Sequence, residues 1–298
     1  MPELEGIIVD ELAADDAIRG LWKIKIQAPK NKPPLNKEEM KVHHWLGINP
    51  LKGDFGIEVE VEGRRLPPFK SNKDSQWVYK KDGSLREGVE YVLVAPLPLD
   101  KAKESLSYLK ERLADSEVRF SFRTSIHVHV NVLDLSRSQL CSYLYLAHLL
   151  EDALVKYSGE HREGNRFCLR MKDAEWKIIA LKEFFKNKGL KMFSPLDMKY
   201  SAINLASLHM FGSIEFRSMR GTLDKGILFP WLDALYRIRD FAMHNSVKEI
   251  DEAIRLTPSG VAKEVFGEHF DKFNYLELEK DIKEAHCRLI ELPYIKGI

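Results

Sequence analysis

The sequence has few cysteines, and none of them is spaced for pairing. Cys141, Cys168 and Cys287 lie far apart and form no CxxC motif, which argues against a cysteine-based zinc site or a disulfide framework. Residues 1–16 are acidic and lack the basic and apolar segments of a signal peptide, and no apolar run approaches the ~20 residues of a membrane span. We therefore expect a cytoplasmic protein without a membrane partner.

An excess of charge of either sign is also missing. The 46 Lys and Arg residues nearly balance the 45 Asp and Glu residues, so the overall field gives no reason to expect a nucleic-acid partner. The sequence contains neither a GxxxxGK[ST] loop nor a GxSxG elbow, so a P-loop nucleotide site and a nucleophilic serine of that type are not predicted. Any ligand must be inferred from a local group of residues.

The chain divides into a short extension and one larger domain. In residues 1–50, the pattern predicts a strand over 20–27, an exposed proline-rich loop over 28–36 and a short helix over 37–46. Residues 51–298 form the predicted catalytic domain, which ends in helices.

Strands and helices are predicted in a mixed order from residue 55 onward. Period-two alternation and turn signals predict strands over 56–63, 76–79, 89–95, 118–122, 125–133, 200–208 and 213–219. Helical spacing predicts a helix over 100–114 with Asp100 as N-cap, and a second from Ser136 or Ser138 to 157. A third is predicted over 173–188, with Gly189 at its C-terminus. A fourth begins at about 223, with Pro230 in its first turns or at a kink, and a fifth spans 277–292. We expect 76–79 to pair with 89–95, and 118–122 with 125–133. Adjacent strand pairs favour an α+β fold, with a mainly antiparallel sheet backed by helices.

Three of these strands carry polar residues two positions apart. Residues two apart share one face of a strand, so Glu58 shares a face with Glu60, with Glu62 continuing it. His127 likewise shares a face with His129, and Glu215 with Arg217. Were these strands neighbours in one sheet, their carboxylates, imidazoles and guanidinium would meet on one patch.

Such a patch is costly without a ligand, because like-charged carboxylates repel and burial opposes their ionisation. Magnesium prefers oxygen ligands and usually retains water or nucleotide phosphate, so glutamates and one imidazole would leave room for ATP. Each motif alone also fits a structural role: a solvated acidic face, a hydrogen-bonded histidine pair or an ion pair. Their joint occurrence favours a metal and nucleotide site.

The same segments carry a more specific combination of motifs. It comprises Phe55-Gly56-Ile57-Glu58-Val59-Glu60, Asp82-Gly83-Ser84-Leu85 with Gly88-Val89-Glu90, His127-Val128-His129-Val130, Lys199-Tyr200-Ser201-Ala202-Ile203-Asn204-Leu205, Ile214-Glu215-Phe216-Arg217 and Gly221-Thr222. In order and spacing, residues 55–241 resemble the amidoligase family, relatives of glutamine synthetase and glutamate–cysteine ligase. The resemblance implies a glutamine-synthetase-like fold, in which a curved antiparallel sheet forms a funnel with nucleotide at one end, the acceptor carboxylate at the other and metals between them.

The resemblance also implies roles for individual residues. The implied metal ligands are Glu58, Glu60, His127 and Glu215, with Glu90 as a further ligand or a substrate contact. Arg217 is the implied contact of the phosphoryl group, His129 contacts phosphate or carboxylate, and both are implied catalytic residues together with Glu215. The implied substrate contacts are Arg162, Asn165, Tyr200 and Asn204.

The implied reaction is ATP-dependent joining of a carboxylate to an amine through an acyl phosphate, with two or more Mg2+ ions, or Mn2+ in their place. The substrates could be amino acids, peptides or proteins. Two alternatives stay open: a metal-dependent phosphohydrolase that uses the same residues, and a catalytically silent binding homologue.

Overall fold

The computed structural model describes residues 39–69, 76–186 and 200–290. The strand predicted over 20–27, the loop over 28–36 and the glycine at position 189 lie outside these ranges. Most of the predicted extension lies outside them as well, so the division at residue 50 stays a prediction.

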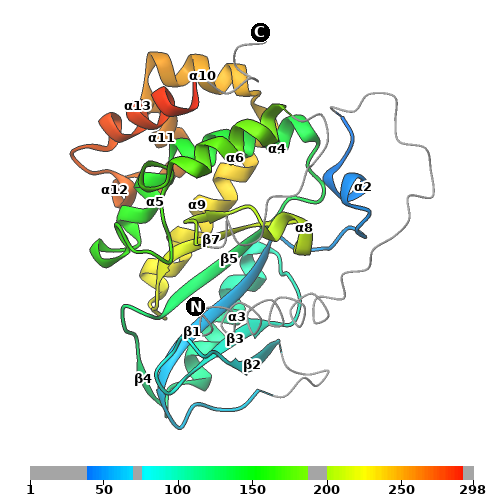
Figure 1. The fold of residues 1–298 in the computed structure, drawn as a ribbon. Coiled ribbons are helices and arrows are strands. Elements are labelled where there is room, and N and C mark those ends of the chain that lie inside the picture. Colours follow the sequence, from blue (N-terminus) through cyan, green and yellow to red (C-terminus); the bar gives the residue numbers. More distant parts are fainter. Residues whose placement is uncertain (1–38, 70–75, 187–199, 291–298) are drawn as a thin grey trace, which may run out of the picture.

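One antiparallel sheet carries the site. Its strands are β1 (Phe55–Arg64), β2 (Trp77–Lys81), β3 (Gly88–Leu93), β4 (Glu117–Arg119), β5 (Ser125–Asn131), β6 (Ile203–Asn204) and β7 (Ser213–Arg220). Their order is β2-β3-β1-β5-β7-β6, with β4 also paired to β1, and all these pairs are antiparallel. The α+β class, the mainly antiparallel sheet and the β2–β3 pair are therefore confirmed (Figure 1).

Two strand predictions were wrong. β4 does not pair with β5: both lie along the same edge of β1, β5 against Phe55–Val59 and β4 against Glu62–Arg64, because the ten-residue β1 is long enough for both. The strand predicted over 200–208 is reduced to β6, because the Asn204 Oδ1 accepts a hydrogen bond from the Ala206 N–H and turns the chain. Helix α8 (Ser207–Phe211) follows and ends at Gly212, whose φ is 67°, a value that favours glycine.

The described residues form ten further α-helices. They are α2 (Val42–Leu46), α3 (Leu99–Arg112), α4 (Arg137–Leu149), α5 (Glu151–Tyr157), α6 (Glu175–Lys186), α9 (Lys225–His244), α10 (Val247–Leu256), α11 (Pro258–Phe266), α12 (Phe270–Phe273) and α13 (Leu278–Leu289). In Figure 1, α3 and α9 run behind the sheet, and α10, α11 and α13 gather above it. No element was predicted over residues 242–276, where α10, α11 and α12 lie.

Helix ends test the capping predictions. Ser136 caps α4 in a reciprocal pair with Gln139, as one of the two predicted caps, but the helix predicted to reach 157 is interrupted at Leu150. Asp100 is not an N-cap: α3 begins at Leu99 after Pro98, and Asp100 lies in its first turn. Pro230 lies inside α9, in its second turn.

The two faces of β1 differ in chemistry although both are buried. Ile57, Val59 and Val61 are fully buried and join the main hydrophobic core, whereas the alternate positions carry glutamates that are also buried. The fold therefore places acidic groups on the opposite face of a strand that is anchored by aliphatic packing.

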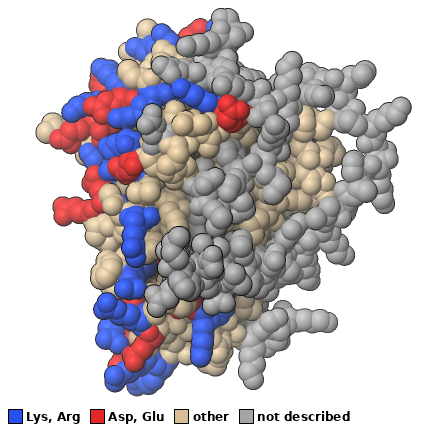
Figure 2. Space-filling view, in the orientation of Figure 1, with Lys and Arg blue, Asp and Glu red and all other residues tan. Residues whose placement is uncertain are grey.

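The described surface mixes both signs of charge. Figure 2 shows Lys and Arg side by side with Asp and Glu over the described part of one face. In the ranges that the structure describes, no helix has both the length and the apolar character needed to cross a membrane.

Candidate functional site

Strand register brings the predicted polar residues onto one face. Residues directly opposite each other in paired strands project to the same side of a sheet. Glu60 lies opposite Glu90, Glu58 lies opposite His127, and His129 lies opposite Glu215. A diagonal row of ionisable groups therefore runs from β3 across β1 and β5 to β7. Their exposed fractions are 3–6%, so the row is almost completely withdrawn from water.

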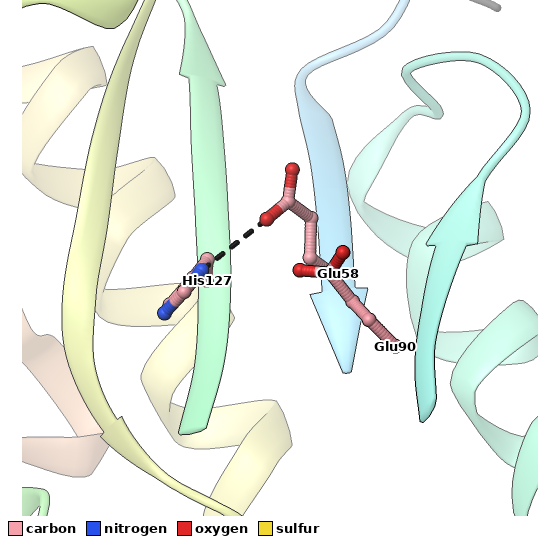
Figure 3. A group of neighbouring side chains, drawn as sticks. All are labelled: Glu58, Glu90 and His127. Atoms are coloured by element: carbon pink, nitrogen blue, oxygen red, sulfur yellow. Dashed lines mark hydrogen bonds and ion pairs between the residues drawn. The ribbon is translucent and has the colours of Figure 1, made fainter. Parts of the chain in front are cut away.

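Glu58 is the centre of this row. One of its oxygens, Oε2, lies 3.2 Å from the Nδ1 of His127, and the other, Oε1, lies 3.4 Å from the Nε2 of His129. The Nδ1 of His127 is also 3.5 Å from the Oε1 of Glu215. Figure 3 shows the side chains of Glu58, Glu90 and His127 projecting from three neighbouring strands. The structure thus brings together all three motifs that the sequence singled out.

Serine hydroxyls contact three of the predicted site residues, Glu60, His127 and His129. Ser125 donates its backbone N–H to the Oε2 of Glu60 at 2.6 Å, and its Oγ lies 2.7 Å from the same oxygen. That Oγ is also 2.9 Å from the Nε2 of His127. Across the sheet, the Oγ of Ser213 lies 3.0 Å from the Nδ1 of His129. Sequence reasoning missed both serines, although each shares the polar face by the same period-two spacing.

The hydroxyl of Ser125 constrains the proton on His127. A serine has one hydroxyl proton; when Glu60 accepts it, the Nε2–H of His127 must donate to the serine oxygen. Without a proton on Nδ1, His127 would present a lone pair to oxygens of Glu58 and Glu215; with a proton there, it donates a hydrogen bond to Glu58. Three acceptors facing one another repel, and either a proton or a cation between them relieves that repulsion.

Further polar partners flank the row. The Nζ of Lys80 on β2 lies 2.7 Å from the Oε2 of Glu90, and the Nδ2 of Asn204 donates to the Oε2 of Glu215 at 2.7 Å. The Nη1 of Arg217 donates to the Oε1 of Glu215 at 2.5 Å. Sequence reasoning missed Lys80, although it lies opposite Glu90 across the predicted hairpin.

Burial and neighbouring groups shift the pKa values of the carboxylates in opposite directions. Burial raises the pKa of Glu58, but hydrogen bonds from His127 and His129 outweigh it, so the pKa of Glu58 lies well below its usual value. Burial, with the nearby charge of Glu58, holds the pKa of Glu90 well above its usual value. Burial also raises the pKa of Glu60.

The row ends in an ion pair at β7. Burial opposes the charge on Glu215, yet Arg217 and the two histidines bring its pKa below the usual value. For Arg217, the charge of Glu215 outweighs burial and raises its pKa. Glu58 and Glu215 are therefore the residues most disposed to stay ionised.

Three groups of side chains in the described residues have the spacing to hold a metal ion. In each group the potential ligand atoms lie within 4.8 Å of one another; the groups are Glu58 with Glu90 and His127, Glu58 with His129 and Glu215, and Glu60 with Asp82 and Glu90. His129 was expected at phosphate or carboxylate and here belongs to a potential ligand group. Asp82 was not predicted as a ligand, because it lies in the turn between β2 and β3, where strand periodicity gives no signal.

The four implied substrate contacts fall into different settings. Asn204 lies in the row and bonds to Glu215. Arg162 is 2% exposed and donates to the backbone carbonyls of Arg217 and Ser218. Asn165 bonds within its own loop, to Phe167 and His161. The ring of Tyr200 lies 6.0 Å from that of Phe167.

The comparison with known proteins identifies no family for this chain. No model of a known protein family matches the chain, and no curated protein matches it.

Proposed function

We propose that the protein is an ATP-dependent carboxylate–amine ligase with a glutamine-synthetase-like catalytic sheet. One observation carries the proposal. The Nδ1 of His127 lies 3.2 Å from a Glu58 oxygen and 3.5 Å from a Glu215 oxygen in a buried row, a set of nitrogen and oxygen donors that suits a divalent cation. The family resemblance of residues 55–241 connects that donor set with nucleotide and amide-bond formation.

The donor set also favours particular cations. Carboxylate oxygens dominate all three potential ligand groups and cysteine is absent from them, which suits hard cations such as Mg2+ and Mn2+. Bound there, magnesium would align the phosphates of ATP and offset their charge. Glu58 and Glu90 belong to two groups each, so more than one ion could share them.

The chain's own residues would orient and stabilise the reactants. A carboxylate is a poor acyl donor at neutral pH, so transfer of the γ-phosphoryl group from ATP would make an acyl phosphate, and an amine would displace phosphate from it. Arg217, which stays positively charged beside Glu215, would stabilise the transferred group. Ser125 and Asn204 would keep Glu60 and Glu215 in their orientations. This route needs no protein nucleophile.

Product analysis tests the proposal. Purified protein with Mg2+, ATP and a panel of carboxylates and amines should release phosphate only when both substrates are present, and mass spectrometry should detect the amide. Glu215→Gln should suppress both signals. Equal phosphate release with and without the amine, with no amide formed, would replace the ligase by a phosphohydrolase on the same residues.

A further inference from the structure

Strand β7 carries one extra residue opposite His127. Ile126 lies opposite Met219 and Val128 lies opposite Phe216, so His127 alone faces both Arg217 and Ser218. A bulge of this kind bends the strand and re-aims a side chain, and it leaves ladder groups to be satisfied from elsewhere. Arg217 stands at the bulge, so the direction of its side chain depends on how the bulge is held.

A buried arginine supplies the missing donors. Arg162 lies in the short helix η1 (Glu160–Arg162). Its Nε donates to the carbonyl of Ser218 at 2.8 Å and its Nη2 donates to the carbonyl of Arg217 at 2.7 Å. On this stretch of β7 the paired residues of β6 end at Phe216, and beyond them the Arg217 N–H donates to the carbonyl of Ala202. The guanidinium of Arg162 therefore supplies the donors for two adjacent carbonyls of the bulge.

The chemistry of arginine suits this task. A guanidinium holds its N–H donors in a rigid planar fork, which can serve two adjacent carbonyls at once, whereas a lysine ammonium lacks that geometry. Both of the side-chain hydrogen bonds described for Arg162 go to backbone carbonyls of the bulge. Burying the positive charge of Arg162 to 2% exposure costs free energy. Fixing the backbone geometry of the bulge is the benefit that offsets this cost.

We propose that Arg162 is a positioning residue that holds the β7 bulge and thereby aims Arg217 at Glu215 and the metal-ligand row. This inference rests on the proposed function, in which Arg217 stabilises the transferred phosphoryl group. Arg162 itself then touches neither nucleotide nor acceptor.

A double-mutant cycle tests the action through Arg217. Arg162→Lys should lower kcat by at least about tenfold and leave the KM for ATP within about twofold, because a misplaced stabilising group affects the transition state. Arg162→Lys combined with Arg217→Lys should lose no more than Arg217→Lys alone. Losses that multiply, or a rise in KM at constant kcat, would show that Arg162 acts independently, and would overturn the inference.

Amide hydrogen exchange tests the stability of the bulge independently of enzymatic activity. Arg162→Lys should speed amide exchange in residues 214–220 relative to the rest of the sheet. Arg239→Lys is the matched control, because Arg239 is also buried and donates to a backbone carbonyl, that of Asn131, away from the bulge. If Arg162→Lys fails to fold, Arg162→Gln replaces it in both measurements.

The two proposals fail separately. A wild-type protein that forms no amide would reject the ligase function, and exchange in β7 would still report whether Arg162 holds the bulge. Unchanged exchange in residues 214–220 would overturn the role of Arg162 whatever the activity.

Discussion

The side chain of Asn204 donates a hydrogen bond of 2.7 Å to the carboxylate of Glu215. The contact crosses from β6 to β7 between residues directly opposite each other in the register, and both side chains are buried. The Oδ1 of Asn204 meanwhile accepts from the Ala206 N–H, so its amide orientation is fixed from both ends. Asn204 thus orients a potential metal ligand.

Removing that hydrogen bond should weaken the site. Asn204→Leu leaves the Glu215 Oε2 without its amide donor, and loss of a partner behind a metal ligand typically costs about 10–100-fold in metal affinity or activity. Activity titrated against Mg2+ checks this. Asn245→Leu is the control, because the Nδ2 of Asn245 donates to the backbone carbonyl of Phe241 at the end of α9. Equal effects of the two substitutions would contradict a specific role for Asn204.

Glu58 and Glu62 should differ sharply in cation binding. Both are buried on the polar face of β1, but Glu58 belongs to two potential ligand groups, whereas Glu62 accepts from the backbone N–H of Arg86. Glu58→Gln should therefore reduce the number or affinity of bound Mn2+ ions in a calorimetric titration, and Glu62→Gln should leave both near the wild-type values. Unaltered binding by Glu58→Gln would exclude Glu58 as a ligand.

Glu90 should make the metal-free protein less stable as the pH rises. Its folded-state pKa is raised by burial and by the charge of Glu58, so its contribution to stability is complete below its usual pKa and is lost as the pH rises through the folded-state pKa. In EDTA, Glu90→Gln should flatten that decline and raise the free energy of unfolding at pH 8. Denaturant unfolding over the range pH 5–9 measures it, and a variant that follows the wild-type curve would refute the prediction.

His148 should destabilise the protein in acid. Burial, as the largest cause, lowers its pKa to about 4, below an unfolded value of about 6.5, so the unfolded state binds the extra proton first. The stability that comes from a neutral His148 is intact above pH 6.5 and is lost as the pH falls toward 4, by about 3 kcal/mol in full. His148→Leu should remove this part of the pH dependence of the free energy of unfolding. Exposed His244 provides the control as His244→Leu, and identical slopes would contradict the prediction.

The site could be predicted to the level of residues that share a strand face. Alternation fixes the face of Glu58 and Glu60 or of His127 and His129, because the side-chain period of a strand is two. Pairing of distant strands is not a local property, and β4 was therefore assigned the wrong neighbour.

Ser125, Ser213 and Lys80 were missed although they lie in strands, and two further missed features lie outside regular strand pairing. Asp82 reaches the row from a turn, and the carbonyls of the bulge at Arg217 and Ser218 accept hydrogen bonds from Arg162 in the short helix η1. Neither leaves a periodic signal. The strand predicted over 200–208 failed because one side-chain contact of Asn204 turned the chain.

Crystals grown with Mn2+ and a non-hydrolysable ATP analogue provide the most direct test of a shared metal and nucleotide site. Anomalous scattering should place ions between Glu58, Glu90 and His127 and between Glu58, His129 and Glu215, with the terminal phosphate near Arg217. If ions and nucleotide bind elsewhere and these side chains contact no ion, the result would contradict the ligase proposal.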